Sequence, residues 1–211
     1  MLALLGLSSS AFAESRDIKF DVPLVFELSG GTSELDQYIK NEHVEHPISG
    51  FVAGRYQFGP FQLGVCYLAI SHSDKTSDTP TGNANEVDSS ENFSLTTLCT
   101  GFLIGNFLLI NGGYGYATFS RSQTTPYATS SNINNSTYNA SGLGMIAGGS
   151  LIPIHLGDHV SIGATGYYFD ATASDFSSDT MVGATSTSKT SGNGSVHTFG
   201  WYAGLSIFIG L

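Results

Sequence analysis

The sequence predicts an all-β fold: an eight-stranded antiparallel up-and-down transmembrane β-barrel with four long extracellular loops and three short periplasmic turns. Three observations predict it. Apolar side chains recur at every second residue over eight runs, which is the period of a β-strand. The breaks between the runs are in turn long and polar or very short. Finally, the runs span 12 to 17 residues, whereas strands of soluble proteins average about 5–6 residues and a tilted strand crossing a bilayer needs about 9–11.

Runs and breaks follow one another in a regular order along the chain. The runs span residues 17–29, 47–58, 61–73, 93–104, 107–120, 140–154, 159–172 and 195–211. The short breaks, at 59–60, 105–106 and 155–158, contain residues that favour tight turns. The long breaks are rich in Ser, Thr, Asn, Asp and Gly and span 30–46, 74–92, 121–139 and 173–194. Short turns at one end and long loops at the other indicate a meander of consecutively paired strands.

The two faces of each run differ in polarity. One face of the first run is wholly apolar, with Ile18, Phe20, Val22, Leu24, Phe26 and Leu28. Lys19, Asp21 and Glu27 share its opposite face, and Arg55 likewise lies opposite the apolar face of the second run. A Lys or Arg facing lipid at mid-depth costs about 2–4 kcal/mol, so we assign the apolar faces to lipid and the charges to the lumen. Run 93–104 has no clean face, and its orientation stays unassigned.

Composition narrows the class of protein. Charged residues make up 11% of the chain, against roughly 25% in an ordinary soluble domain. No apolar stretch reaches the roughly 20 residues that a membrane-spanning helix needs. The formal net charge of −10 argues against nucleic-acid binding, which requires a positive surface. In lipid every backbone polar group must be paired within the protein, so the last run is expected to pair with the first and close the barrel.

The first 13 residues, MLALLGLSSSAFA, have the pattern of a secretory signal peptide. Leu2 to Leu7 form an apolar core, and Ala11 to Ala13 fit a small-residue cleavage site. The positive region that usually opens such a peptide is missing, so we expect a signal peptide truncated at its start. The alternative is a buried N-terminal helix. The predicted mature domain is 14–211, a barrel outside the cytoplasm.

On this architecture, residues 17–211 resemble the small eight-stranded outer membrane barrels of Gram-negative bacteria, the OmpA/OmpX-like and "porin family" surface proteins. Members of that family end in a strand with alternate apolar residues that the barrel-assembly machinery reads. Leu205, Ile207, Ile209 and Leu211 match this alternation, although the family ends in Phe. The resemblance implies a location in the cell outer membrane, with lipopolysaccharide, phospholipid and the assembly machinery as partners.

The lumen charges Lys19, Asp21, Glu27 and Arg55 are candidates for ion pairs. A cation in a narrow lumen needs carboxylate partners, because an unpaired buried charge is strongly unfavourable. The alternative is a gate whose pairs exchange and pass ions. Eight strands leave an interior just wide enough for side chains, whereas aqueous pores need about 16, so we expect a plug rather than a pore.

Cys66 and Cys99 lie on adjacent runs, each a few residues from the turn-side end. An even number of cysteines in an exported chain suggests a disulfide. Both side chains must point the same way to form one, and run 93–104 is ambiguous. Two free buried thiols therefore remain an equal alternative.

Three polar motifs could suggest metal binding or catalysis. "HVEH" (His43 to His46, with Glu45) has metal-binding residue types, but side chains three apart converge only on a helix. "SHSD" (Ser71 to Asp74) cannot form a local triad, because neighbours on a strand face opposite ways. Asp170 and His197 are expected near the outer rim, where lipid-modifying barrel enzymes hold catalytic groups. Thr198 and Phe199 break the His-x-Ser pattern of those enzymes. We therefore expect no enzyme, metal or cofactor.

The long loops carry most of the charge, −7 of the total −10. Loops on a rigid scaffold commonly carry function. We therefore expect an outer membrane surface protein with a structural or interaction role, adhesin-like or antigen-like, in which the loops meet an extracellular or host ligand. The alternatives are a small porin-like channel, a lipid-modifying enzyme and, outside membranes, a secreted lectin-like sandwich.

Overall fold

The computed structural model describes residues 24–37, 42–78, 85–105, 107–126, 133–182, 185–192 and 196–211. The strands are β1 (Leu24–Gln37), β2 (Glu42–Phe58), β3 (Phe61–Asp78), β4 (Asn85–Ile104), β5 (Leu108–Pro126), β6 (Ile133–His155), β7 (Val160–Val182), β8 (Thr185–Gly192) and β9 (Val196–Gly210). No helix in these ranges is long and apolar enough to span a membrane.

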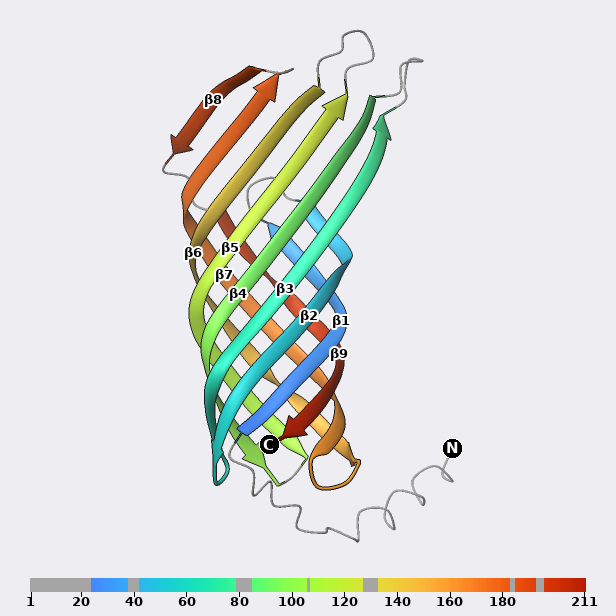
Figure 1. Cartoon of the computed structure of the whole chain (residues 1–211), viewed down its shortest axis with the longest axis vertical. Helices are drawn as coiled ribbons and strands as arrows, with labels where there is room; N and C mark the ends of the chain where they lie inside the picture. Colours follow the sequence, from blue (N-terminus) through green and yellow to red (C-terminus); the bar gives the residue numbers. More distant parts are fainter. Residues whose placement is uncertain are drawn as a thin grey trace.

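Eight of the strands close into an antiparallel barrel, as predicted (Figure 1). Neighbours pair in chain order from β1 to β7, and β9 then pairs with both β7 and β1. The closing pair runs from Val25 opposite Gly210 to Gln37 opposite Thr198. Closure leaves no strand edge in lipid, because each of the eight barrel strands has a neighbour on both sides.

The ninth strand, β8, was not predicted. It pairs with the far end of β7, from Phe176 opposite Gly192 to Val182 opposite Thr185, and lies outside the ring (Figure 1). Its sequence, TSTSKTSG, contains only Ser, Thr, one Lys and one Gly, so it has no apolar residues whose spacing could predict a strand.

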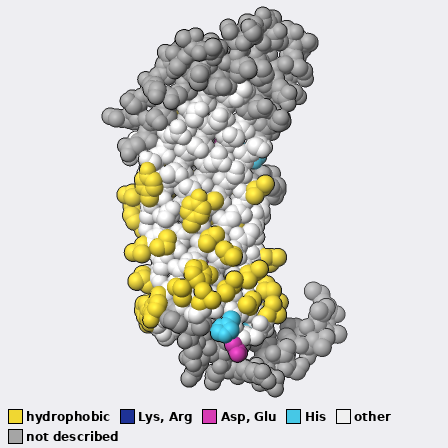
Figure 2. Space-filling view, viewed as in Figure 1, with side chains coloured by type: hydrophobic (Ala, Val, Ile, Leu, Met, Phe, Trp, Pro, Cys, Tyr) yellow, Lys and Arg dark blue, Asp and Glu magenta, His cyan; other side chains and the backbone are white. Residues whose placement is uncertain are grey.

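Side chains alternate between lumen and lipid along every barrel strand. Residues assigned to the lipid face are exposed, among them Leu28, Val52, Leu63, Val65, Ile110, Met145 and Ile207. Figure 2 shows, on the face in view, apolar side chains gathered over the part of the barrel nearer the short turns. In β4 the buried positions are Phe93, Leu95, Thr97 and Cys99, while Thr96, Leu98 and Thr100 face outward. The lumen side of β4 is partly apolar and its lipid side contains threonines. Its residue pattern therefore did not indicate which face points into the lumen.

Aromatic side chains mark both borders of the apolar band, a feature of membrane barrels. Near the short turns, Phe61 stacks on Phe58 at 6.4 Å and meets Phe102 edge-on at 5.1 Å between ring centroids. At the other border, exposed aromatic side chains come from β3, β5, β7 and β9: Tyr67, Tyr116, Tyr168 and Trp201. We call these four the outer girdle.

The predicted loop boundaries are wrong, because the strands continue past the outer girdle. Most of 121–139, for example, belongs to β5 and β6, which pair as far as Pro126 opposite Ile133. Beyond the lipid both faces of a strand meet water, so the ladder continues on Ser and Thr without an apolar face. β1 likewise reaches Gln37, eight residues beyond the predicted end at 29. Residues 17–23 and the predicted signal peptide 1–13 lie outside the described ranges.

The short turns are tight, as predicted. Gly59, Gly105 and Gly157 have φ values of 62°, 57° and 92°, which glycine adopts without steric cost. Two prolines inside strands lie at bulges, where no ladder hydrogen bond is lost. His46 and Pro47 together face Ser33, and Ile152 and Pro153 together face Gly163.

The bulge at Pro47 coincides with a division of the barrel wall. The β2–β3 ladder ends at Ile48 opposite Ser71, although β2 begins at Glu42 and β3 runs on to Asp78. Pro47, which precedes Ile48 on β2, has no N–H that could donate a hydrogen bond to β3. Above this level β2 pairs with β1, and β3 pairs with β4.

Candidate functional site

The centre of the lumen holds a buried ion pair. Arg55 Nη1 donates to Glu27 Oε2 at 2.7 Å, and both side chains are 0% exposed. β1 and β2 pair Val25 with Arg55 and Glu27 with Ala53, so the two charges are diagonal neighbours on the inward face. The other two candidates, Lys19 and Asp21, lie outside the described ranges.

Hydroxyl groups from the three strands that follow β1 around the closing seam complete the shell of the Glu27 carboxylate. Its Oε1 accepts hydrogen bonds from Thr165 Oγ1 at 2.8 Å and from Ser150 and Ser206 Oγ at 3.2 Å each. These residues come from β7, β6 and β9. Sequence reasoning missed them, although a polar residue on an inward-facing position was a signal. The bonds satisfy the carboxylate and so reduce the cost of burying it.

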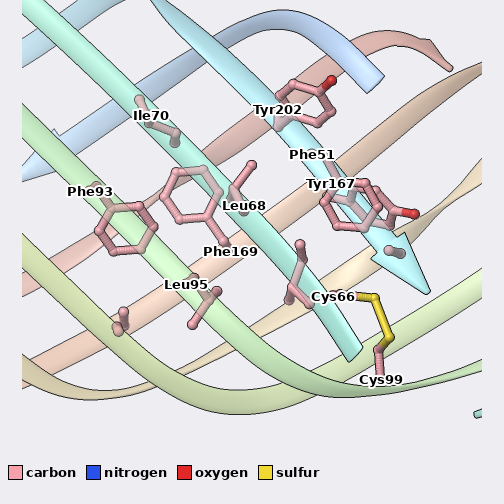
Figure 3. Packing of buried hydrophobic residues seen from close by; sticks show 14 residues of the cluster. Phe51, Cys66, Leu68, Ile70, Phe93, Leu95, Cys99, Tyr167, Phe169 and Tyr202 are labelled. Atoms are coloured by element: carbon pink, nitrogen blue, oxygen red, sulfur yellow. A yellow bond between two sulfur atoms is a disulfide. The ribbon is translucent and has the colours of Figure 1, made fainter. Parts of the chain in front are cut away.

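Tyr167 on β7 joins the pair to the rest of the wall. Its hydroxyl accepts from Asn111 Nδ2 at 2.8 Å and from Arg55 Nη2 at 3.4 Å, and it donates to Glu27 Oε2 at 3.4 Å. The ring packs on Phe51, with 4.4 Å between the centroids (Figure 3). One network thus links six strands: β1, β2, β5, β6, β7 and β9.

Two apolar layers enclose this polar layer. Toward the extracellular end, Phe93 stacks on Phe169 with 5.2 Å between centroids, beside Leu68, Ile70 and Leu95 (Figure 3). Toward the short turns lies a second buried cluster of Val25, Leu103, Leu109, Ile152 and Phe208. All of these side chains are at most 8% exposed. The interior is therefore a packed core at three successive levels.

Cys66 and Cys99 form a disulfide beside the ion pair. Their Cα atoms are 5.9 Å apart, both side chains point into the lumen, and Arg55 Nη2 lies 3.6 Å from Cys66 Sγ. Gly64 pairs with Arg55 on one side and with Cys99 on the other. A Cβ at Gly64 would overlap the carbonyl oxygen of Gly54, so this close approach of strands requires glycine.

Polar pairs lie on the outside of the barrel at the outer girdle. His197 Nε2 is 2.9 Å from Asp170 Oδ1, and Tyr168 donates to Asp170 Oδ2 at 3.4 Å. Nearby, Trp201 Nε1 donates to Glu34 Oε2 at 2.6 Å. Asp170 and His197 thus meet at the rim, where the sequence placed them. The arrangement suits the border between lipid and water, where amphipathic side chains are favourable.

The remaining motifs are described only in part, since the side chains of residues 43–46 and of Asp74 lie outside those that the structure describes. Ser71 is exposed and donates to Asn92 Oδ1 at 2.7 Å across β3 and β4. The segment His43–His46 belongs to strand β2, which corrects its assignment to a loop. Among the residues whose side chains are described, no three His, Cys, Asp or Glu side chains form a group suited to a metal ion.

The C-terminal apolar residues line the lipid side of β9. Leu205, Ile207 and Leu211 are 73%, 47% and 64% exposed, and Ile209 is partly exposed. Their strand lies between β1 and β7 at the closing seam. Recognition of these residues during assembly stays a prediction.

No family model matches the chain, and no curated protein matches it by sequence. A major outer membrane protein from Thermus thermophilus matches with a TM-score of 0.54 and 13% identity, over 88% of this chain and 98% of that one. The outer membrane protease OmpT from Escherichia coli matches with a TM-score of 0.51 and 8% identity, over 89% and 96%. The attachment invasion locus protein Ail of Yersinia pestis gives 0.48 and 11%, over 87% and 97%.

At 13% and 8% identity, the first two matches support the fold of this chain and no more than the fold. They agree with the closed antiparallel barrel. The chain has the fold of the small outer membrane β-barrel proteins, OmpA/OmpX-like in its eight closing strands, and it is a protein of the cell outer membrane.

Proposed function

We propose that this protein is a non-enzymatic surface scaffold whose strand ends outside the membrane bind a cationic, extended partner. The observation that carries the proposal is the acidic sheet beyond the outer girdle. We call it the extracellular extension; it comprises residues 34–37, 42–47, 72–78, 85–91, 121–126, 133–139, 173–182 and 185–192. These stretches hold eleven Asp and Glu against three Lys and Arg, a formal charge of −8. Such a field attracts cations and repels polyanions.

The division between β2 and β3 supports an extended partner. Above Ile48 and Ser71, the described pairings give residues 42–47 and 72–78 no strand partner across the division. An open strand edge can accept a further strand through backbone hydrogen bonds. A groove of about 360 Å³ lies at the base of the division, lined in part by Ile48, Gly50 and Ser71. Charge and backbone geometry thus favour the same kind of ligand at the same place.

The packed lumen supports a scaffold rather than a channel. A conducting path would have to cross two apolar layers and the Arg55–Glu27 pair. We expect no stepwise conductance from the protein in planar bilayers; reproducible steps would favour the porin-like alternative.

The lipid-modifying alternative has its own test. Lipid A and phospholipid that stay unchanged after incubation with the folded protein, with and without Ca²⁺, would contradict it. Lipopolysaccharide, phospholipid and the barrel-assembly machinery remain its proposed partners in the membrane.

The binding test uses the full barrel in phospholipid nanodiscs. A lysine-rich extended peptide is expected to bind, and a glutamate-rich peptide of the same length is not. Binding should weaken as salt rises, since exposed charges are screened within about 10 Å at 0.1 M salt. Equal affinity for both peptides would contradict the proposal.

Two controls separate charge from strand addition. Glu42→Gln combined with Glu45→Gln removes charge at the division, whereas Asp158→Asn removes charge in a short turn at the other end of the barrel. Only the first change should weaken binding. A lysine-rich peptide methylated on alternate backbone nitrogens keeps its charge but cannot form a full ladder. Its binding should be much weaker; undiminished binding would mean attraction by charge alone.

A further inference from the structure

The Cys66–Cys99 disulfide lies where no reagent for thiol chemistry can reach it in the closed barrel. Cys66 is 2% exposed and Cys99 is 1% exposed. The sulfur atoms point into the lumen from β3 and β4, on the inner side of a continuous ladder that pairs every residue from Phe61 to Asp78. Paired strands lie about 4.7–4.9 Å apart and leave no opening between them.

The two ends of the lumen are closed as well. On the extracellular side the disulfide is covered by the cluster containing Leu68, Phe93, Leu95 and Phe169 (Figure 3). On the turn side it is covered by Leu103, Leu109 and the other members of the second apolar cluster. Arg55 occupies the remaining space beside Cys66. Each layer spans the narrow interior, so a second protein cannot approach either sulfur.

Thiol–disulfide exchange requires such an approach. A thiolate attacks one sulfur of a disulfide and forms a mixed disulfide before the cross-link is passed on. The attacking and leaving groups both need room beside the reacting sulfur. The closed barrel does not provide it.

We infer that Cys66 and Cys99 are oxidised on the exported chain before the barrel closes, by a protein whose own active-site disulfide serves as the oxidant. One cysteine thiolate attacks that disulfide, displaces one of its sulfurs as a thiolate and forms a mixed disulfide. The second cysteine thiolate then attacks the sulfur of the first cysteine. The oxidant leaves as a dithiol that carries both electrons, and the two cysteine protons balance its two new thiols. The chain is thus assigned a class of partner, a protein outside the cytoplasm with an oxidising active-site disulfide. It is also assigned an order of events, in which oxidation comes before closure of the barrel.

Local topology makes this order feasible. The two cysteines are 33 residues apart and belong to consecutive strands that pair as a hairpin. The hairpin can bring them together without β1 or β9, which only the last closing step joins. The cross-link then fixes the orientation of β4, the strand whose polarity pattern leaves its two faces ambiguous.

The test compares oxidation of the same full-length chain before and after folding. Reduced protein is either kept unfolded in urea or folded into detergent micelles, and both samples receive the same concentration of oxidised glutathione, whose disulfide reacts with accessible thiolates in either medium. Free thiols are then alkylated after unfolding and counted by mass. The unfolded chain should form the disulfide at least about 100-fold faster than the folded chain, which should retain both thiols. Similar rates in the two samples would overturn the inference.

Two further samples guard against trivial results. A variant with Cys66→Ser, Cys99→Ser and Ser71→Cys exposes one thiol on the outside; its glutathionylation in the folded barrel shows that the reagents work in micelles. The Cys66→Ser, Cys99→Ser variant shows by heat-modifiability whether the barrel closes without the cross-link. If the reduced chain fails to fold while the oxidised chain folds, closure requires the disulfide, and the proposed order stands. Oxidation of a folded, heat-modifiable reduced barrel at the unfolded rate would refute it.

Discussion

Arg55 and Glu27 meet 2.7 Å apart in the centre of the barrel, with neither side chain in contact with solvent. Hydroxyl groups from three other strands, β6, β7 and β9, bond to the pair, and among the described residues only Arg55 Nε of its charged groups has no hydrogen-bond partner. Removing one partner leaves the other as an isolated buried charge, which is far less favourable than the pair. The pair is therefore expected to be sensitive to substitution of either residue alone.

Removing one charge of the pair should strongly destabilise the barrel. Arg55→Ala or Glu27→Ala is expected to lower the free energy of unfolding by about 3–5 kcal/mol, because the remaining charge is buried without its partner. The measurement is equilibrium urea unfolding in lipid vesicles. The double variant Arg55→Met, Glu27→Gln should lose less than the sum of the single changes. Strictly additive losses would show that the two residues act independently.

The hydroxyl of Tyr167 should contribute to stability through hydrogen bonding alone. Tyr167→Phe keeps the ring on Phe51 but removes the partner of Asn111 and Arg55. The expected loss is about 1–3 kcal/mol, the cost of leaving buried polar groups unpaired. Tyr168→Phe is the matched control, since its hydroxyl lies outside and bonds only at an exposed site. A loss of equal size in both variants would contradict a special role for the lumen network.

Gly64 should tolerate no side chain. Its Cβ would overlap the Gly54 carbonyl oxygen, so Gly64→Ala forces β2 and β3 apart beside Arg55 and is expected to cost about 1–3 kcal/mol. At Gly50 the nearest atom to an added Cβ is the Ser29 carbonyl oxygen at 3.7 Å, an ordinary contact. Gly50→Ala should therefore fold and unfold like the parent chain. Heat-modifiability and urea midpoints of the two variants provide the comparison.

The outward face of β3 should show the depth profile of a membrane. Val65→Arg places a cation in the middle of the apolar band and is expected to cost about 2–4 kcal/mol, whereas a charge near the border costs about 0–1 kcal/mol. Ser71→Arg, on the same face of β3 beyond Tyr67, is the control. Folding into vesicles of defined thickness measures both. Equal tolerance of the two changes would mean that this face does not meet lipid.

Loss of the disulfide should destabilise the barrel without changing its outer surface. For a separation of 33 residues, chain-entropy arguments give about 3–4 kcal/mol. The Cys66→Ser, Cys99→Ser variant should lose this amount in urea unfolding. In the parent protein, reductant added to the folded barrel should change nothing until denaturant opens it. Rapid reduction of the folded form would show that the lumen is open.

Much of the fold could be predicted because it depends on local alternation. A few neighbouring residues are enough to indicate the strand period, the tight turns at Gly59, Gly105 and Gly157, and the absence of charge from the lipid face. Lipid enforces these features strongly, since a mid-depth charge or an unpaired backbone group is costly there. The same reasoning failed where lipid no longer constrains the sequence. The Ser- and Thr-rich strand ends and β8 looked like loops, because both of their faces meet water.

The alternation of residue types was enough to assign Arg55 and Glu27 to the lumen and Val65 and Leu205 to lipid, and to infer that the chain closes on itself. Which inward groups meet depends on the folded ring. Glu27 bonds to Thr165 and Ser206, 138 and 179 residues away, because closure and the stagger of the strands bring their levels together. The disulfide was undecided for the same reason, since the orientation of β4 follows from its register with β3 and β5. A side chain's direction is a local property of its strand, whereas its partners across the lumen are fixed by the whole ring.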